Sequence, residues 1–298
     1  MKVYDFQTID VFASHRFGGN QLAVFTDARG LRPETMQNIA HEMNLSETAF
    51  VLPPDDPAND CRVRIFNRTA EMAFAGHPTI GTAVVLGRSL PPETREMVLE
   101  VPAGLVRVAL LRDGGSVTGA RVVAPRSLEL GETVPAGAIA ACLRVPDGAI
   151  AVQRHPPIHG SMGNPYVIVE LTQTGLAKCS PDPAAFRAAR SALSTPAERF
   201  SIYAYHRQDD IIGARMFAPL AGTWEDAATG SAAAPLAGLL LSLDAGERRR
   251  FTIFQGEAMG RPSRIDAEAW RDGAEIRASI EGRCVPVFRG SFAADESD

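Results

Sequence analysis

Residues 74–87, FAGHPTIGTAVVLG, indicate the fold of this chain. The glycine and Pro78 near the start suit the first turn of a helix. From 80 to 86 the segment is almost wholly apolar, and a helix that is hydrophobic all round is normally buried at the centre of a fold. A second such helix is predicted over 230–242, apolar from Ala232 onwards. Two central helices are unusual in a layered α/β protein, and they predict a strand barrel around a helix in each half of the chain.

Most of the remaining pattern is typical of strands. Short β-branched or alternating runs are separated by Gly and Pro, and the clearest further helices are expected at 33–43 and 182–193. The predicted strands are 3–12, 22–26, 48–52, 62–66, 97–101, 105–111, 119–124, 165–171, 200–205, 212–217, 251–254 and 275–280. Because strands outnumber helices, the predicted class is α+β.

The two halves share an order of features that indicates an internal duplication. Each half has a Gly-Asn pair before a strand, then an Arg-x-Phe strand, then a glycine that starts a central helix. The matching features are Gly19-Asn20 and Gly163-Asn164, Arg64-Ile65-Phe66 and Arg215-Met216-Phe217, and Gly76 and Gly230. Three short matches could also arise by chance. We expect two barrel-like domains, 1–126 and 127–293, with 284–290 returning to the first, and a disordered tail at 294–298.

Composition favours a small-molecule partner over nucleic acid or a membrane. The net charge is -5, with no dense run of Lys or Arg, and no apolar stretch approaches a membrane span. The four cysteines are far apart with no C-x-x-C pair, so we expect reduced, buried thiols. Asp5 and Asp10 interrupt the first apolar segment where a signal peptide would be continuous, which favours a cytoplasmic protein.

The starts of the two apolar helices are candidate anion sites. Backbone N–H groups there lack partners and carry the positive end of the helix dipole, about +0.5 charge. Gly76 allows close ligand approach in the first, and Thr229, Gly230 and Ser231 add hydroxyl and backbone donors in the second. The alternative is a structural cap, in which Thr229, Ser231 or Asp226 only satisfies free N–H groups.

Glu47 lies between helix 33–43 and the apolar strand 48–52. Desolvation against this strand would raise the pKa of the carboxyl, as a general acid/base at neutral pH requires. The alternatives are an exposed loop glutamate, and, for His77, a hydrogen-bonded structural histidine.

Other chemistries lack their usual signals. There is no G-x-S-x-G, Walker A or G-x-G-x-x-G motif. His155 and His159 have metal-like spacing, but the prolines between them forbid the helix that would align the imidazoles. We expect neither a metal nor a cofactor.

Five motifs together resemble the phenazine-biosynthesis PhzF-like family over nearly the whole chain. They are Asn44-Leu45-Ser46-Glu47-Thr48-Ala49-Phe50, Phe74 to Ala83, Gly163-Asn164-Pro165, Glu225 to Ala232, and Gln255-Gly256 with Gly260-Arg261-Pro262-Ser263. This resemblance implies a diaminopimelate-epimerase-like fold of two pseudo-repeated domains, each a barrel-like sheet around a central helix, with the active site in the cleft between them. It also implies a homodimer.

The resemblance further implies an isomerase that needs no cofactor. The best-understood member acts on a dihydro-hydroxyanthranilate, and its acid/base glutamate matches Glu47, which would move a proton between carbons of a small carboxylated substrate. His77, Asp226 and Ser231 match residues that orient substrate or assist the transfer. Amides near Gly76, Gly230 and Ser231 would bind the carboxylate, with Asn20, Ser46 and Thr229 as further substrate-binding residues.

Departures from the family pattern affect residues around the expected site. They are Gln21, Asn67, Arg68, Tyr166 and Ala227. Racemases of this fold use two cysteines near the helix starts, and neither 74–79 nor 226–232 contains one, which disfavours a two-thiol racemase. An epimerase or racemase acting on an amino or hydroxy acid through another second base, and a non-catalytic carboxylate binder, remain as alternatives.

Overall fold

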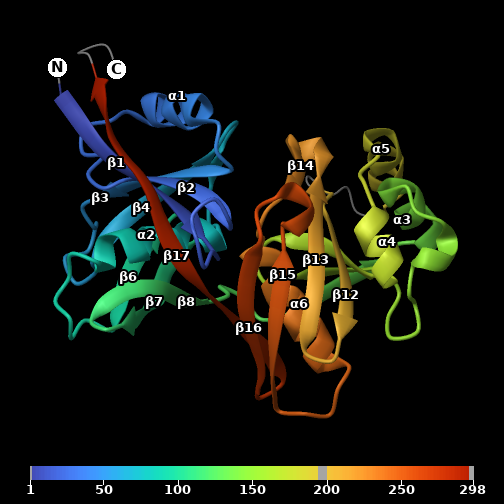
Figure 1. Cartoon of the computed structure of the whole chain (residues 1–298). Coiled ribbons are helices and arrows are strands. Elements are labelled where there is room, and N and C mark those ends of the chain that lie inside the picture. The colour runs from blue at the N-terminus through green and yellow to red at the C-terminus, as the bar shows by residue number, and fades with distance from the viewer. Residues whose placement is uncertain (1, 194–199, 295–298) are drawn as a thin grey trace. The chain divides into compact units, whose positions relative to one another are not determined.

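The computed structural model describes residues 2–193 and 200–294, and the chain divides into two compact units (Figure 1). Unit 1 comprises Met1–Val123 and Glu281–Asp298, and unit 2 comprises Ala124–Ile280. The tail predicted at 294–298 lies outside the described residues, except for Ala294, the last residue of a strand.

Unit 1 is a closed β-barrel. Each strand pairs with the next in the order β1, β2, β3, β4, β6, β7, β8, β17, and β17 pairs back with β1. The β2–β3 and β4–β6 pairs are parallel, and the β1–β17, β1–β2, β3–β4, β6–β7 and β7–β8 pairs are antiparallel. The bounds are β1 Lys2–Val11, β2 Asn20–Phe25, β3 Glu47–Leu52, β4 Cys61–Asn67, β5 Glu71–Met72, β6 Glu96–Val101, β7 Gly104–Asp113, β8 Ser116–Val123 and β17 Glu275–Ala294, of which β5 is a short strand beside β4.

The apolar helix α2 (Gly76–Gly87) fills this barrel, and all but one of its residues are buried. Gly81 explains how the helix approaches the strands so closely. A Cβ at this position would lie 2.5 Å from Leu22 Cδ2 and 2.8 Å from Val11 Cγ2. The glycine therefore fixes the depth of α2 in the barrel, and with it the position of the first turn.

Helix α1 (Pro33–Met43) packs on the outside and leads into β3. It buries Met36, Ile39 and Ala40 against an aromatic cluster that includes Phe25 and Phe50. Asn44 ends the helix in the left-handed conformation at φ 51°, which asparagine tolerates well. This turn brings the chain to Glu47, the first residue of β3.

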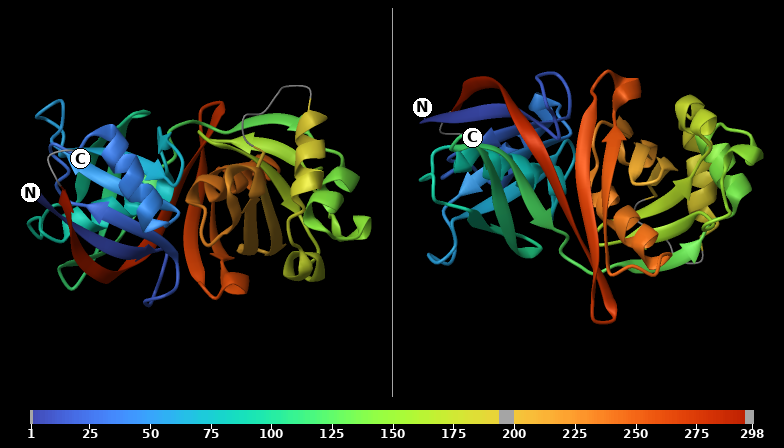
Figure 2. Two further views of the ribbon diagram at one scale, coloured as in Figure 1. Left: turned by 90° about the horizontal axis from the view of Figure 1, so that it is seen from above. Right: turned by 60° about the horizontal axis from the view of Figure 1, so that its bottom comes forward.

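Unit 2 repeats the architecture around helix α6 (Gly230–Ser242), as Figure 2 shows. Its strands pair in the order β9, β10, β11, β12, β13, β15, β16, β17, with β11–β12 and β13–β15 parallel. Helices α3, α4 and α5 pack outside on an apolar cluster. The bounds are β9 Glu129–Thr133, β10 Ile158–Ser161, β11 Pro165–Glu170, β12 Ile202–Gln208, β13 Ile211–Ala218, β14 Thr223–Asp226, β15 Arg248–Gln255, β16 Ser263–Asp272, α3 Ala136–Leu143, α4 Gln173–Lys178 and α5 Pro183–Ser191, with single 3-10 turns at Asp147–Ala149, Pro219–Ala221 and Glu257–Met259.

The strand registers confirm the duplication. In unit 1, Thr48 pairs with Ala23 on one side and Phe66 on the other. In unit 2, Ile202 pairs with Val167 and Phe217. Counting from these pairs, Gly19-Asn20 corresponds to Gly163-Asn164 and Arg64 to Arg215, as the sequence predicts.

The predicted fold is confirmed, and the missed elements are those with weak local signals. Strands β5, β9, β10, β14 and β16 and helices α3 and α4 have no counterpart among the predicted elements. β16 shows why, because its inward positions Ile265, Ala267 and Ala269 are mostly small and alternate with acidic residues. Its pairing with β15 makes it a strand. Among the described residues, no helix is long and apolar enough to cross a membrane.

Candidate active site

The nine predicted site residues fall into two groups, one in each unit. Those of unit 1 are Asn20, Ser46, Glu47, Gly76 and His77, and those of unit 2 are Asp226, Thr229, Gly230 and Ser231. In unit 1, the starts of β2 and β3 and the first turn of α2 place the group. In unit 2, the end of β14 and the first turn of α6 place it.

In unit 1, Glu47 and His77 face one another. The first residue of β3 and the second residue of α2 bring Oε2 of Glu47 to 3.1 Å from Nε2 of His77. The side chains are 15% and 7% exposed, so both are largely shielded from water. The distance is short enough for a hydrogen bond, although the angles are not those of one.

The His77 imidazole is neutral at physiological pH. Burial lowers its pKa to about 3, and a hydrogen bond with the backbone of Gln21 opposes this only in part. The lowered pKa favours the neutral imidazole, in which one ring nitrogen carries a hydrogen and the other a lone pair.

Asn20 and Ser46 join the strand ends beside this pair. The Ser46 hydroxyl donates to Oδ1 of Asn20 at 3.0 Å, and Asn20 is 2% exposed. Gly19, with φ +64°, precedes Asn20, and a Cβ there would lie 2.3 Å from the carbonyl oxygen of Val11. The Gly-Asn motif is therefore required for the chain to enter β2 in this register.

The N-cap residues of the two central helices are Ala75 and Thr229, and neither side chain caps its helix. Neither first turn contains an acidic residue. The Thr229 hydroxyl turns away from the helix and donates to Oδ2 of Asp226 at 2.6 Å. Both first turns therefore keep the dipole and amide arrangement that favours an anion.

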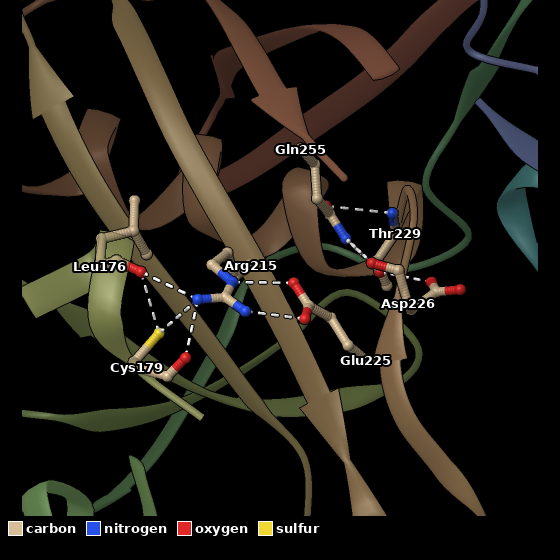
Figure 3. A network of polar contacts seen from close by, with 7 residues as sticks. All are labelled: Leu176, Cys179, Arg215, Glu225, Asp226, Thr229 and Gln255. Atoms are coloured by element: carbon tan, nitrogen blue, oxygen red, sulfur yellow. Dashed lines mark hydrogen bonds and ion pairs between the residues drawn. The ribbon is translucent and has the colours of Figure 1, made fainter. Parts of the chain in front are cut away.

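In unit 2, the turn from Asp226 to Thr229 is held by Gln255 (Figure 3). The Gln255 amide nitrogen donates to the Asp226 carbonyl at 2.9 Å and to the Thr229 hydroxyl at 3.0 Å. Its oxygen accepts from the Thr229 N–H and from the Tyr203 hydroxyl, both at 3.2 Å. One buried amide thus fixes both ends of the turn and thereby the Asp226 carboxylate.

The other residues of the motif that begins at Gln255 and ends at Ser263 also hold this turn in place. Gly256 has φ +78°, and a Cβ there would lie 2.4 Å from the Arg261 carbonyl oxygen and 2.6 Å from that of Ala227. The Ser263 hydroxyl donates to the Ala227 carbonyl at 2.9 Å. The motif serves the site by holding the loop before α6.

Ser231 is paired with a tyrosine. The hydroxyls of Tyr166 and Ser231 lie 2.7 Å apart, and Tyr166 is 8% exposed. Sequence reasoning assigned no role to Tyr166, Tyr203 or Gln255. Gln255 lies within one of the family motifs, and Tyr166 is a departure from another. The sequence therefore marks both positions as notable but does not predict which residues they contact.

A duplicated ion pair anchors the segment before each central helix. Arg215 donates to both carboxylate oxygens of Glu225 at 2.8 Å and to the carbonyls of Leu176 and Cys179 at 3.2 and 2.7 Å (Figure 3). The equivalent Arg64 donates to Glu71 at 2.7 and 2.6 Å. Each arginine lies over the phenylalanine two residues later, and each glutamate precedes its helix-starting glycine by the same interval.

The repeat also shows which residues of unit 2 correspond to the Glu47–His77 pair. Counting from the paired strands, Ser201 corresponds to Glu47. Ser231 corresponds to His77, since each follows the glycine that starts its helix. Unit 2 therefore has the hydroxyls of Ser201 and Ser231 at the two positions where unit 1 has the Glu47 carboxylate and the His77 imidazole.

Metal and thiol chemistry find no support among the described residues. No group of three or more His, Cys, Asp or Glu side chains there could hold a metal ion. His155 bonds the Pro156 carbonyl and the Tyr205 hydroxyl. All four cysteines are free and buried, as expected, and burial raises the pKa values of Cys61, Cys142 and Cys284 to about 12 and that of Cys179 to about 11.

Comparisons with known proteins agree with this geometry. Residues 9–290 match the family model described as phenazine biosynthesis-like protein. The chain is 38% identical to an uncharacterized isomerase of Mesorhizobium japonicum, over 98% of this chain and 99% of that protein. It is 36% identical to trans-2,3-dihydro-3-hydroxyanthranilate isomerase of Pseudomonas aeruginosa, over 93% and 94%. A PhzF-family crystal structure from Bacillus anthracis superposes with a TM-score of 0.87 at 23% identity, over 99% and 100%.

Proposed function

The chain belongs to the phenazine biosynthesis-like protein family and is an isomerase, and from this premise we propose that it moves a proton between two carbons of a small carboxylated substrate, with Glu47 as the acid/base. The observation that carries the proposal is the Glu47–His77 contact of 3.1 Å in a shielded site. The predicted site residues Asn20, Ser46, Gly76, Thr229, Gly230 and Ser231 are proposed as substrate-binding groups, and His77 and Asp226 as groups that assist the transfer.

The neutral His77 imidazole supports a one-base transfer. Glu47 as a carboxylate takes a proton from one carbon and leaves an electron pair in the substrate's conjugated system. The resulting carboxylic acid can donate to Nε2 of His77, which lies 3.1 Å away, when that nitrogen carries the lone pair. Glu47 then returns the proton to a second carbon, so the protons balance over the cycle and no cofactor enters the proposed steps.

A cyclic, dihydro-hydroxyanthranilate-like compound is the proposed substrate class. The relative from Pseudomonas aeruginosa is named for that substrate. An uncapped helix start with no acidic residue suits a substrate carboxylate, and both α2 and α6 provide one. A homodimer and a cytoplasmic location remain predictions from the sequence, and light scattering of the purified protein would test the first.

The test is proton–deuteron exchange followed by NMR in deuterated buffer, with trans-2,3-dihydro-3-hydroxyanthranilate and other small cyclic carboxylates. Glu47→Gln keeps the size of the side chain and removes the acid/base, so exchange should fall by about 10²- to 10⁴-fold or more while ligand binding remains. Glu42→Gln makes the same change at an exposed glutamate of α1, so it is the matched control and should retain exchange. Undiminished exchange in Glu47→Gln would refute the proposal.

An epimerase acting on an amino or hydroxy acid is the second candidate of the same enzyme class. It needs a second base for the opposite face of the carbon, but Ser201 and Ser231 stand at the unit 2 positions equivalent to Glu47 and His77. Asp226, bonded to Thr229, would have to serve instead. Deuterium incorporation at a chiral carbon with loss of optical activity would identify this candidate. A non-catalytic binder is disfavoured because the named relatives are isomerases.

A further inference from the structure

The second residue of α6 contacts a different kind of side chain from the second residue of α2. In unit 1, His77 faces a carboxylate at 3.1 Å. In unit 2 the corresponding Ser231 faces the Tyr166 hydroxyl at 2.7 Å. By strand register Tyr166 corresponds to Leu22 of unit 1, an apolar side chain buried against α2. The phenol is therefore a feature of unit 2 alone.

The surroundings of the phenol keep it in place. Tyr166 and Tyr203 come from the neighbouring strands β11 and β12, and both are buried, at 8% and 0% exposure. Burial, with the nearby Tyr166 and Asp226 as smaller causes, raises the pKa of Tyr203, so its hydroxyl stays protonated and donates to Gln255. Ser231 is only partly buried, whereas the next ten residues of α6, up to Leu241, are buried.

Either of the two hydroxyls can be the donor in this hydrogen bond. A serine hydroxyl donates one hydrogen bond and accepts others. When Tyr166 donates to Ser231, the serine proton remains available to a further acceptor. The positive end of α6, with no acidic residue in its first turn, favours an anionic acceptor there.

We propose that Tyr166 is a positioning residue that fixes the Ser231 hydroxyl as a donor to an anionic oxygen of the substrate, so that this hydroxyl pair selects carboxylated substrates. The proposal rests on the proposed function for the reaction, and it adds a residue that determines which molecules bind. Unit 1 has no counterpart of this hydroxyl pair, because Leu22 and His77 stand at the corresponding positions.

A double-mutant cycle in ligand affinity tests the proposal. Anthranilate is the probe, because its equilibrium binding can be measured by calorimetry without any turnover. Ser231→Ala should raise its Kd by about 10- to 100-fold, as expected for loss of a hydrogen bond to a charged group. Tyr166→Phe, which removes only the hydroxyl, should raise Kd by about 3- to 10-fold. In the Ser231→Ala background the same change should raise Kd by less than about 2-fold.

A matched control and a second readout separate positioning from structural support. Tyr205→Phe removes a buried hydroxyl from β12 that bonds His155 and Glu170, and it should leave Kd unchanged. For a turned-over substrate, Tyr166→Phe should raise KM with little change in kcat.

Equal effects of Tyr166→Phe in both backgrounds, an unchanged Kd, or no binding of anthranilate to the wild type would each overturn the proposal. Undiminished proton exchange in Glu47→Gln would refute the proposed reaction, but it would not affect the double-mutant cycle in anthranilate affinity.

Discussion

The ion pair between Arg215 and Glu225 gives a prediction whose size follows from its burial. The side chains are 14% and 10% exposed, and Arg215 also donates to two backbone carbonyls of the α4 region. Arg215→Met would leave the Glu225 carboxylate shielded from water without its partner. Such a loss costs about 3–5 kcal/mol of unfolding free energy.

The equivalent pair in unit 1 provides an internal comparison. Arg64 and Glu71 are 22% and 32% exposed, so water can replace much of the lost interaction. Arg64→Met should therefore cost about 1 kcal/mol. The double change Arg215→Met with Glu225→Leu removes the unpaired charge and should recover about half of the loss. The other half reflects the Leu176 and Cys179 carbonyls that still lack their donor.

Urea unfolding followed by tryptophan fluorescence measures these differences. The only two tryptophans, Trp224 and Trp270, lie in β14 and β16, so fluorescence reports on unit 2. Circular dichroism reports on both units and is needed for Arg64→Met. A cost for Arg215→Met equal to that for Arg64→Met would refute the argument that burial sets the energy, and so would a double variant less stable than the single one.

Three further predictions concern strain, protonation and thiol access. Gly256→Ala should cost at least about 2 kcal/mol in the fluorescence assay, because its Cβ would meet two carbonyl oxygens at 2.4 and 2.6 Å. Gly260→Ala, at φ +70° with open space around it, should cost only about 1 kcal/mol, and similar costs would count against the steric argument. Since burial lowers the His77 pKa from 6.5 to about 3, the unfolded chain binds a proton between these values that the folded chain does not. This contribution to stability is therefore lost as pH falls from 7 towards 3, and the pH dependence should be weaker in His77→Gln, measured by circular dichroism. The four buried thiols should not react with a disulfide reagent at pH 8 until the protein is unfolded, and rapid native labelling would contradict the burial that raises their pKa values.

The sequence predicts the central helices and the duplication because both depend on patterns of residues close together in the chain. Residues 80–86 and the segment from Ala232 onwards are apolar on every side, and only a buried position satisfies such a helix. The Gly-Asn and Arg-x-Phe motifs recur because each half repeats the same strand pairing. The family, the fold and the isomerase class follow from these motifs.

Tertiary structure alone decides the site contacts. The Glu47–His77 and Tyr166–Ser231 contacts each join residues far apart in sequence, and burial in the fold lowers the pKa of His77. The pairing of β16, whose small and acidic residues give a weak strand signal, is decided in the same way. Sequence patterns report which side of an element is buried, whereas the protonation and direction of a polar group depend on what the folded chain brings within hydrogen-bond distance. For this reason the sequence determined the two barrels and the candidate residues, and the fold decided that one helix start carries a carboxylate and an imidazole while the other carries paired hydroxyls.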